Sequence, residues 1–301
     1  MIYEEQLMKE EQFLRDILST KGYELCKMAG EGATAQVYKV KEKESGQWFA
    51  CKIGEKKELL FAESELLRNL NHPLFPEWKE YWEEAGAGFL VMEFLQGRSL
   101  NMCLETYGKF SQKEVLRITL ALADGLGYLH ERKPAVIYCD LKPENIILQS
   151  DGRVRLTDLG AAAVPKGWKV GTPGYAAPEQ MLTDKKREER SKPVPASDIY
   201  ALGVVMHQML TGQYPCADNG EMLPVRKYDP KISLGVEDII WHCTRPCPRE
   251  RIQGMRELMT KLGGYYNRSK LQIMRLEWKT VRKRKSRLVY EKNVWDNSGS
   301  L

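Results

Sequence analysis

The spacing of apolar residues changes after the first third of the chain. Before this point short apolar runs predict strands over 23–29, 36–41, 47–53 and 89–94. After Gly97 helical spacing predicts helices from 111 onward and over 198–210, 237–243 and 255–262. Helical spacing also occurs earlier, over 3–19 and 57–69. The pattern therefore predicts an α+β fold, in which a small β-rich part with one main helix precedes a larger, mainly helical part.

Local signals mark two of the helix ends. Ser111 and Glu114 have the spacing of a capping box, in which each side chain bonds the backbone N–H at the position of the other. The helix that follows has an apolar face made of Val115, Ile118, Leu122, Leu126 and Leu129. Gly22 is expected to end the first helix.

Length and composition are those of a globular protein. The 301 residues are 43% apolar, which suffices for one large domain or two lobes. No run of about 18 apolar residues occurs, and the acidic N-terminus lacks an apolar leader, so we expect neither a transmembrane helix nor a secretory signal. Seven scattered cysteines indicate reduced thiols and a cytoplasmic location.

The positive charge is concentrated in the C-terminal tail. Residues 268–292 carry ten basic and two acidic residues, a net charge of +8, so the rest of the chain carries −3 of the total of +5. This distribution does not favour a nucleic-acid partner. The tail, taken as residues 263–301, fits a packed helix with a solvated basic face, a segment that contacts a membrane surface, or a linker to a membrane-spanning part.

Residues 138–145, Tyr-Cys-Asp-Leu-Lys-Pro-Glu-Asn, place an acid, a base and an amide within six positions. A second acid follows thirteen residues later, at Asp158. Phosphoryl transfer requires such a set, because a carboxylate orients the hydroxyl, a cation meets the moving phosphate and oxygen ligands hold Mg2+.

Two features of the β-rich part add to this chemistry. A turn with Gly30 and Gly32 lies between two predicted strands, and glycine lets a backbone approach phosphate closely. Lys52 lies within an apolar strand, where it is either on an exposed face or paired with a carboxylate. Glu63 and Glu65 on the next helix are the candidate partners.

These motifs, in this order and followed by Ala177-Pro178-Glu179, resemble the protein kinase family. The resemblance covers residues 23–262 and implies the bilobal kinase fold, with an N-lobe over 23–95 and a C-lobe over 96–262. Residues 1–22 would then be a helical N-terminal extension. The finer resemblance is to the eukaryotic-like serine/threonine kinases of bacteria.

The resemblance also implies a role for each matching residue. Asp140 would be the catalytic aspartate, Lys142 would meet the γ-phosphate, and Lys52, held by Glu63, would bind the α- and β-phosphates of ATP. The implied ligands of Mg2+ or Mn2+ are Asn145 and Asp158. The implied nucleotide-binding residues are Gly30, Gly32, Val37, Ala50, Lys52, Met92, Glu93, Leu95 and Ile147. The substrate would be a protein, and Lys142 together with Thr172 favours serine or threonine over tyrosine.

Several residues depart from the family pattern. Ala35 stands in place of a third glycine in the turn, Ser99 in place of a ribose-binding acid and Leu159 in place of a phenylalanine. Tyr138 replaces a histidine, and Cys139 replaces the arginine that clamps a phosphate on the activation loop, which makes the chain a non-RD kinase. The loop from 159 to 170 contains no Ser, Thr or Tyr. Clamp and target are both missing, so we expect activity that does not depend on phosphorylation of this loop.

Two other functions stay open. A pseudokinase scaffold is suggested by Tyr138, Cys139 and Ala35, although none of them would do chemistry, and a small-molecule kinase is disfavoured by the peptide-docking motif at 171–179. The charged segment 183–196 fits a solvated loop or a docking site. The sequence leaves the oligomeric state open.

Overall fold

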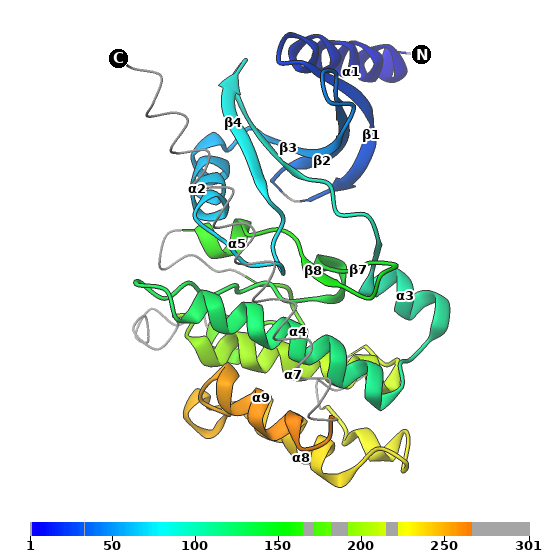
Figure 1. Cartoon of the computed structure of the whole chain (residues 1–301), viewed down its shortest axis with the longest axis vertical. Helices are drawn as coiled ribbons and strands as arrows, with labels where there is room; N and C mark the ends of the chain where they lie inside the picture. Colours follow the sequence, from blue (N-terminus) through cyan, green and yellow to red (C-terminus); the bar gives the residue numbers. More distant parts are fainter. Residues whose placement is uncertain (1, 33, 165–170, 182–191, 215–221, 267–301) are drawn as a thin grey trace. The chain divides into compact units, whose positions relative to one another are not determined.

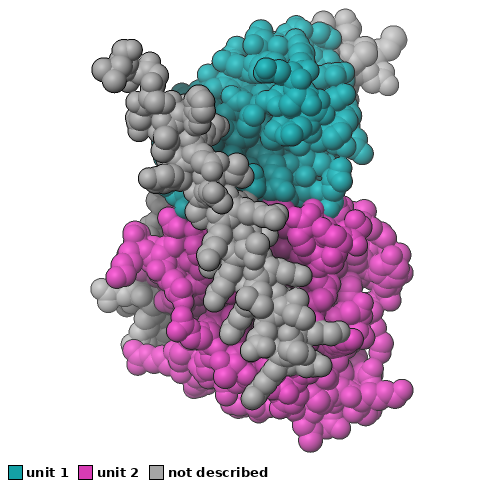
Figure 2. All heavy atoms as spheres, in the orientation of Figure 1, with its two compact units in different colours: residues 1–70, 76–96 teal, residues 71–75, 97–301 magenta. Residues whose placement is uncertain are grey.

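The computed structural model describes residues 2–32, 34–164, 171–181, 192–214 and 222–266, with the backbone only for 2–10. The chain divides into two compact units, which Figure 2 colours separately. Unit 1 contains residues 1–70 and 76–96, and unit 2 contains residues 71–75 and 97–301. Among the described residues, no helix combines the length and apolar character needed to cross a bilayer.

Unit 1 is built around an antiparallel sheet. Its elements are α1 (Ile2–Thr20), β1 (Tyr23–Glu31), β2 (Gln36–Glu42), β3 (Trp48–Gly54), α2 (Lys57–Arg68), β4 (Trp78–Glu84) and β5 (Ala87–Glu93). Within the described part of the chain the sheet has five strands in the order β1-β2-β3-β5-β4. The predicted strands and the helix between them are confirmed to within about two residues, and β4 is an addition that the sequence analysis did not predict.

The first helix belongs to the core of unit 1. Figure 1 shows α1 beside β1, where the Arg15 guanidinium donates to the carbonyl of Leu25 at 2.9 Å. Ile17 and Leu18 are buried against the inner residues of the sheet, such as Val40. Burial of this apolar face, rather than helix propensity alone, accounts for a helix at this position.

Unit 2 is mainly helical. Its elements are β6 (Arg98–Ser99), α3 (Leu100–Tyr107), α4 (Gln112–His130), β7 (Ile146–Leu148), β8 (Val154–Leu156), α5 (Gly160–Ala163), α6 (Pro178–Met181), α7 (Pro195–Thr211), α8 (Leu234–Cys243) and α9 (Met255–Gly263), with short 3-10 turns at Pro143–Asn145, Val225–Lys227 and Pro248–Glu250. Figure 1 shows α4 and α7 side by side. Sheet and helices together confirm the predicted α+β class.

The two long helices follow from the sequence signals. The capping box of Ser111 and Glu114 is present at the start of α4, and the predicted apolar face of α4 is fully buried. Helix α7 is buried along nearly its whole length, as expected for a helix that is apolar on all sides. The short β6 and α3 precede α4 in the sequence, after Gly97. The sequence pattern did not predict either of them.

Candidate active site

Lys52 and Glu63 form a buried ion pair within unit 1. The Lys52 Nζ donates to both carboxylate oxygens of Glu63, at 2.9 and 2.7 Å, from β3 to α2. The two side chains are only 10% and 5% exposed. The structure thus selects the paired alternative for Lys52. The other candidate, Glu65, is 45% exposed and lies 3.6 Å from Arg68.

The two glycines of the turn, Gly30 and Gly32, are not crowded by other atoms. A Cβ added to Gly30 would meet no atom within 4 Å, and one added to Gly32 would make an ordinary contact of 3.4 Å with the Ala35 carbonyl. Neither glycine has a left-handed φ. Internal packing therefore does not require glycine at either position, whereas close approach of a phosphate to the backbone would.

The other nucleotide-binding candidates of unit 1 lie on the middle strands. Val37 pairs with Lys52 across β2 and β3, and Ala50 pairs with Met92 across β3 and β5. Glu93 ends β5, and its N–H donates to the carbonyl of Glu77 at 2.8 Å. Leu95 follows Glu93 outside the strand. In unit 2, the candidate Ile147 lies on β7.

The predicted acid and base meet at one threonine in unit 2. Lys142 Nζ lies 2.9 Å from Asp140 Oδ2 and donates to Thr172 Oγ1 at 2.8 Å. The Thr172 hydroxyl in turn donates to Asp140 Oδ1 at 2.6 Å. The carboxylate is therefore held at both oxygens, and its orientation is fixed by the segment that follows the activation loop.

Asn145 and Asp158 present oxygens beside this cluster. The Asn145 Nδ2 donates to the carbonyl of Asp140 at 2.9 Å, so its Oδ1 is the acceptor end of the amide. The N–H of Thr157 donates to the Asn145 carbonyl at 2.9 Å, which places Asp158 one residue beyond this pairing. Asp158 has a φ of 57°, a conformation uncommon outside glycine. An amide oxygen and a carboxylate are the ligand types that Mg2+ prefers.

The buried Asp198 holds the backbone of the catalytic loop, residues 138–145, just before Asp140. Asp198 on α7 accepts the N–H groups of Tyr138 at 2.8 Å and Cys139 at 2.9 Å, and its Oδ2 lies 2.7 Å from His130 Nε2. The Asp198 side chain is 1% exposed. Hydrogen bonds to a buried carboxylate are strong, so Asp198 fixes the two residues immediately before Asp140.

Tyr138 and Cys139 are accommodated without loss of partners. The buried Tyr138 hydroxyl donates to the carbonyl of Thr157. Burial raises the pKa of Tyr138 well above its ordinary value, and the nearby charges of Asp158 and Asp140 raise it further. Burial also raises the pKa of the Cys139 thiol, so the neutral thiol is the stable form.

The comparison with known proteins identifies the family. A family model described as the protein kinase domain matches residues 23–272, most of the chain. The chain belongs to the protein kinase family.

Individual kinases are similar to this chain over part of their length. The serine/threonine-protein kinase RUNKEL of Arabidopsis thaliana is 33% identical over 202 residues, 64% of this chain and 14% of that protein. CBL-interacting protein kinase 21 of Oryza sativa subsp. japonica is 29% identical over 253 residues, 76% of this chain and 47% of that protein. The human cAMP-dependent protein kinase catalytic subunit PRKX is 30% identical over 214 residues, 67% of this chain and 57% of that protein.

The chain thus spans less than two thirds of the length of each of these relatives. All three are eukaryotic, so they give no support to the finer resemblance to bacterial kinases.

A second buried ion pair anchors the kinase domain's Ala-Pro-Glu motif. Arg251 donates from two nitrogens to the two oxygens of Glu179, both at 2.7 Å. The Ser197 hydroxyl donates to the same carboxylate at 2.7 Å. Burial would raise the pKa of Glu179, but the bonds from Arg251 and Ser197 outweigh it and hold the pKa below its ordinary value.

Sequence reasoning missed two residues of this region. Gln180 is buried and bonds the catalytic loop, but a glutamine after Ala-Pro-Glu carries no recognisable signal. His130, at the end of α4, gave no signal either. Ser99, in a position where kinases often have a ribose-binding acid, accepts the N–H of Met102 at 3.2 Å as the N-cap of α3. Residues 165–170 of the activation loop, residues 183–191 and residues 267–301 of the tail lie outside the described residues.

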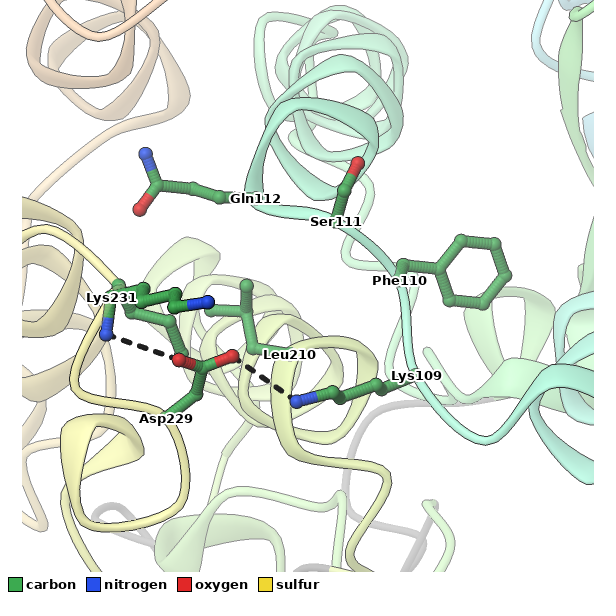
Figure 3. A pocket seen from close by; sticks show the side chains of 8 residues that line it. Lys109, Phe110, Ser111, Gln112, Leu210, Asp229 and Lys231 are labelled. Carbon is green, nitrogen blue, oxygen red and sulfur yellow. Dashed lines mark hydrogen bonds and ion pairs between the residues drawn. The ribbon is translucent and has the colours of Figure 1, made fainter.

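Figure 3 shows a pocket of about 250 Å³ at the start of α4, lined by Lys109, Phe110, Ser111, Gln112, Leu210, Asp229, Lys231 and Ile232. Lys109 Nζ lies 3.1 Å from Asp229, and the N–H of Lys231 donates to the same carboxylate at 3.0 Å. The Ser111 hydroxyl donates to Glu114 at 2.6 Å. Lys109, Asp229 and Lys231 thus bond one another and Ser111 caps α4, so we assign the pocket no part in the kinase chemistry.

Proposed function

We propose that this protein is an ATP-dependent protein kinase that transfers the γ-phosphoryl group to serine or threonine hydroxyls of a protein substrate. The observation that carries the proposal is the cluster of Asp140, Lys142 and Thr172, in which an acid and a cation are joined by one hydroxyl. The names of the relatives, which include serine/threonine-protein kinases, support the same reaction.

Each member of the cluster has a role in this reaction. The Asp140 carboxylate accepts a hydrogen bond from the substrate hydroxyl and orients it. This makes the hydroxyl oxygen a better nucleophile, because its proton can pass to the carboxylate. The Lys142 ammonium, 2.9 Å from Asp140, would neutralise charge on the transferred phosphoryl group. Thr172, in the segment that follows the activation loop, bonds Asp140 and Lys142 and so keeps both side chains in place.

The described residues fit ATP with Mg2+. Lys52, oriented by Glu63, supplies a cation for the α- and β-phosphates, and the turn at Gly30 and Gly32 leaves room for them. Asn145 Oδ1 and the Asp158 carboxylate would hold the metal. Mg2+ held there would supply positive charge that offsets the negative charge on the phosphate oxygens. Mn2+, which takes similar oxygen ligands, is a second candidate.

Transfer of radiolabelled phosphate from ATP to generic protein substrates, for wild type and Asp140→Asn, tests the proposal. The base contributes about 10^2–10^4-fold, so the variant should lose nearly all labelling while it still binds Mg-ATP. Equal labelling by both proteins would rule the proposal out. Nucleotide binding without labelling by wild type would instead identify a pseudokinase, and labelling of small metabolites alone would identify a small-molecule kinase.

We further infer that activity does not depend on activation-loop phosphorylation, as the non-RD sequence suggests. Cys139 cannot clamp a phosphate, its thiol is buried, and residues 159–170 offer no hydroxyl. Phosphatase treatment of the purified protein should leave kcat unchanged, and Thr172→Glu should abolish activity because the Thr172 hydroxyl is already bonded to the catalytic pair. A large loss of kcat after phosphatase treatment would contradict the inference.

A cytoplasmic location and membrane contact through the tail stay predictions from the sequence.

A further inference from the structure

Gln180 joins two segments of unit 2 that are 41 residues apart in the sequence. Its side chain is 3% exposed and comes from α6. The Nε2 donates to the carbonyl of Cys139 at 2.9 Å, and the Oε1 accepts the N–H of Ala177 at 2.9 Å. One amide therefore connects the residue before Asp140 to the segment that follows Thr172.

The bonded carbonyl belongs to a strained residue. Cys139 has a φ of 70°, which non-glycine residues seldom adopt and which persists only when neighbouring groups hold it. Its N–H is held by Asp198 at 2.9 Å, and its C=O is held by Gln180. Hydrogen bonds at both ends thus fix the backbone that leads directly into Asp140.

Gly171 lies against the same bond. A Cβ at Gly171 would come within 3.0 Å of Gln180 Nε2, 3.1 Å of the Cys139 carbonyl and 2.8 Å of the Ala176 Cβ. Gly171 also has a left-handed φ of 118°. The chain that leaves the activation loop therefore passes directly over the Gln180–Cys139 contact, one residue before Thr172.

We propose that Gln180 is a positioning residue for phosphoryl transfer: through the Cys139 carbonyl it holds the catalytic loop in register with the Thr172 segment. The hydrogen bond from Gln180 to the Cys139 carbonyl is always available, because an uncharged amide makes it and no phosphate is needed. The proposal rests on the kinase function proposed above and explains how a loop with cysteine in place of arginine stays ordered.

Gln180→Met tests the proposal with a side chain of similar length that cannot donate. An orphaned buried carbonyl is costly, so kcat should fall about 10-fold or more, while KM for ATP stays within about twofold because Lys52 and the glycine turn are untouched. The matched control is Thr119→Val, a buried change on α4 that should leave kcat unchanged.

Gln180→Glu separates positioning from a merely structural role. Glutamate keeps an acceptor for Ala177, but only its protonated form can donate to the Cys139 carbonyl, and its ionised form repels that oxygen. Burial raises the pKa of such a carboxyl. The ratio of its kcat to that of wild type should therefore rise as pH falls, with Thr119→Val giving a flat ratio.

The outcomes are distinguishable. A kcat of Gln180→Met equal to wild type, or a flat pH ratio for Gln180→Glu, would overturn the proposal. If wild type itself transfers no phosphate, the kinase function fails, and hydrogen exchange then decides on Gln180. Faster exchange of peptide 138–145 in Gln180→Met than in Thr119→Val would support the hold, and equal exchange would refute it.

Discussion

Two ion pairs that are buried in the described part of the chain look alike by distance but are built differently. Lys52–Glu63 in unit 1 and Arg251–Glu179 in unit 2 both have a shortest N–O distance of 2.7 Å, and no side chain in either is more than 10% exposed. Burial and distance therefore do not tell which pair serves the structure and which serves the reaction. What distinguishes the two pairs is what the N–H groups of each cation bond to.

Every N–H group of the Arg251 side chain is directed at the protein. Besides Glu179, its acceptors are the carbonyls of Arg245, Pro246 and Ala196, at 2.7–2.9 Å. A planar guanidinium with its fork fully bonded is a fixed structural joint. Arg251 therefore ties the Ala-Pro-Glu motif to the C-terminal part of unit 2.

Lys52 is a different kind of cation. An ammonium is a point charge without a fixed fork, and the Glu63 carboxylate orients it from one helix. The same group can therefore attract an added anion without breaking a rigid joint. The buried arginine thus serves the structure, and we propose that the buried lysine serves nucleotide binding.

The largest predicted effect is on the stability of the arginine pair. Arg251→Met should lower the free energy of unfolding by about 3–5 kcal/mol, because it leaves the Glu179 carboxylate buried and unpaired. Adding Glu179→Gln should recover much of this loss, and kcat should recover with the fold. Urea unfolding and kcat of the single and double variants measure this. A double variant that is stable but inactive would show that this pair also serves the reaction.

The lysine pair should behave in the opposite way. Lys52→Met should lower kcat/KM by about 10^2–10^3-fold, the usual effect of removing one electrostatic contact to a reacting group. Adding Glu63→Gln removes the stranded charge and should restore stability, yet activity should stay low because the phosphate contact is still missing. Steady-state kinetics with urea unfolding would detect this separation. Recovery of activity in the double variant would contradict it.

The fold was predictable where local signals were strong. The capping box of Ser111 and the all-apolar stretch of α7 predicted two long helices, because the local sequence shows where α4 begins and that α7 is buried. Strand β4 escaped prediction since its sequence, Trp-Lys-Glu-Tyr-Trp-Glu-Glu, is mostly polar. It forms one arm of a hairpin with β5, across a turn of two residues, Ala85 and Gly86, that both have a positive φ. Pairing with the apolar β5, rather than an apolar run of its own, makes it a strand.

The site was predictable where a motif carries chemistry. Asp140, Lys142 and Lys52 could be found because acid and base at fixed spacing have few structural explanations. Gln180 could not, since its role arises from a carbonyl that is distant in sequence and from the positive φ of Cys139. A backbone acceptor has no residue type, so a partner of this kind is visible only in three dimensions.

The smallest predicted effect is a pH dependence that is confined to the structural pair. The pKa of Glu179 is held below its ordinary value of 4.5, so the folded state favours the carboxylate. This stability is fully present above pH 4.5 and is lost as pH falls through the folded pKa, because the protonated acid no longer pairs with Arg251. The difference in free energy of unfolding between wild type and Glu179→Gln should therefore shrink as pH falls below 4.5. Urea unfolding across this range, with Glu131→Gln as the control for an exposed carboxylate, measures the difference. A difference that stays constant with pH would show that the contribution of Arg251 is shape rather than charge, and would remove the electrostatic half of the contrast with Lys52.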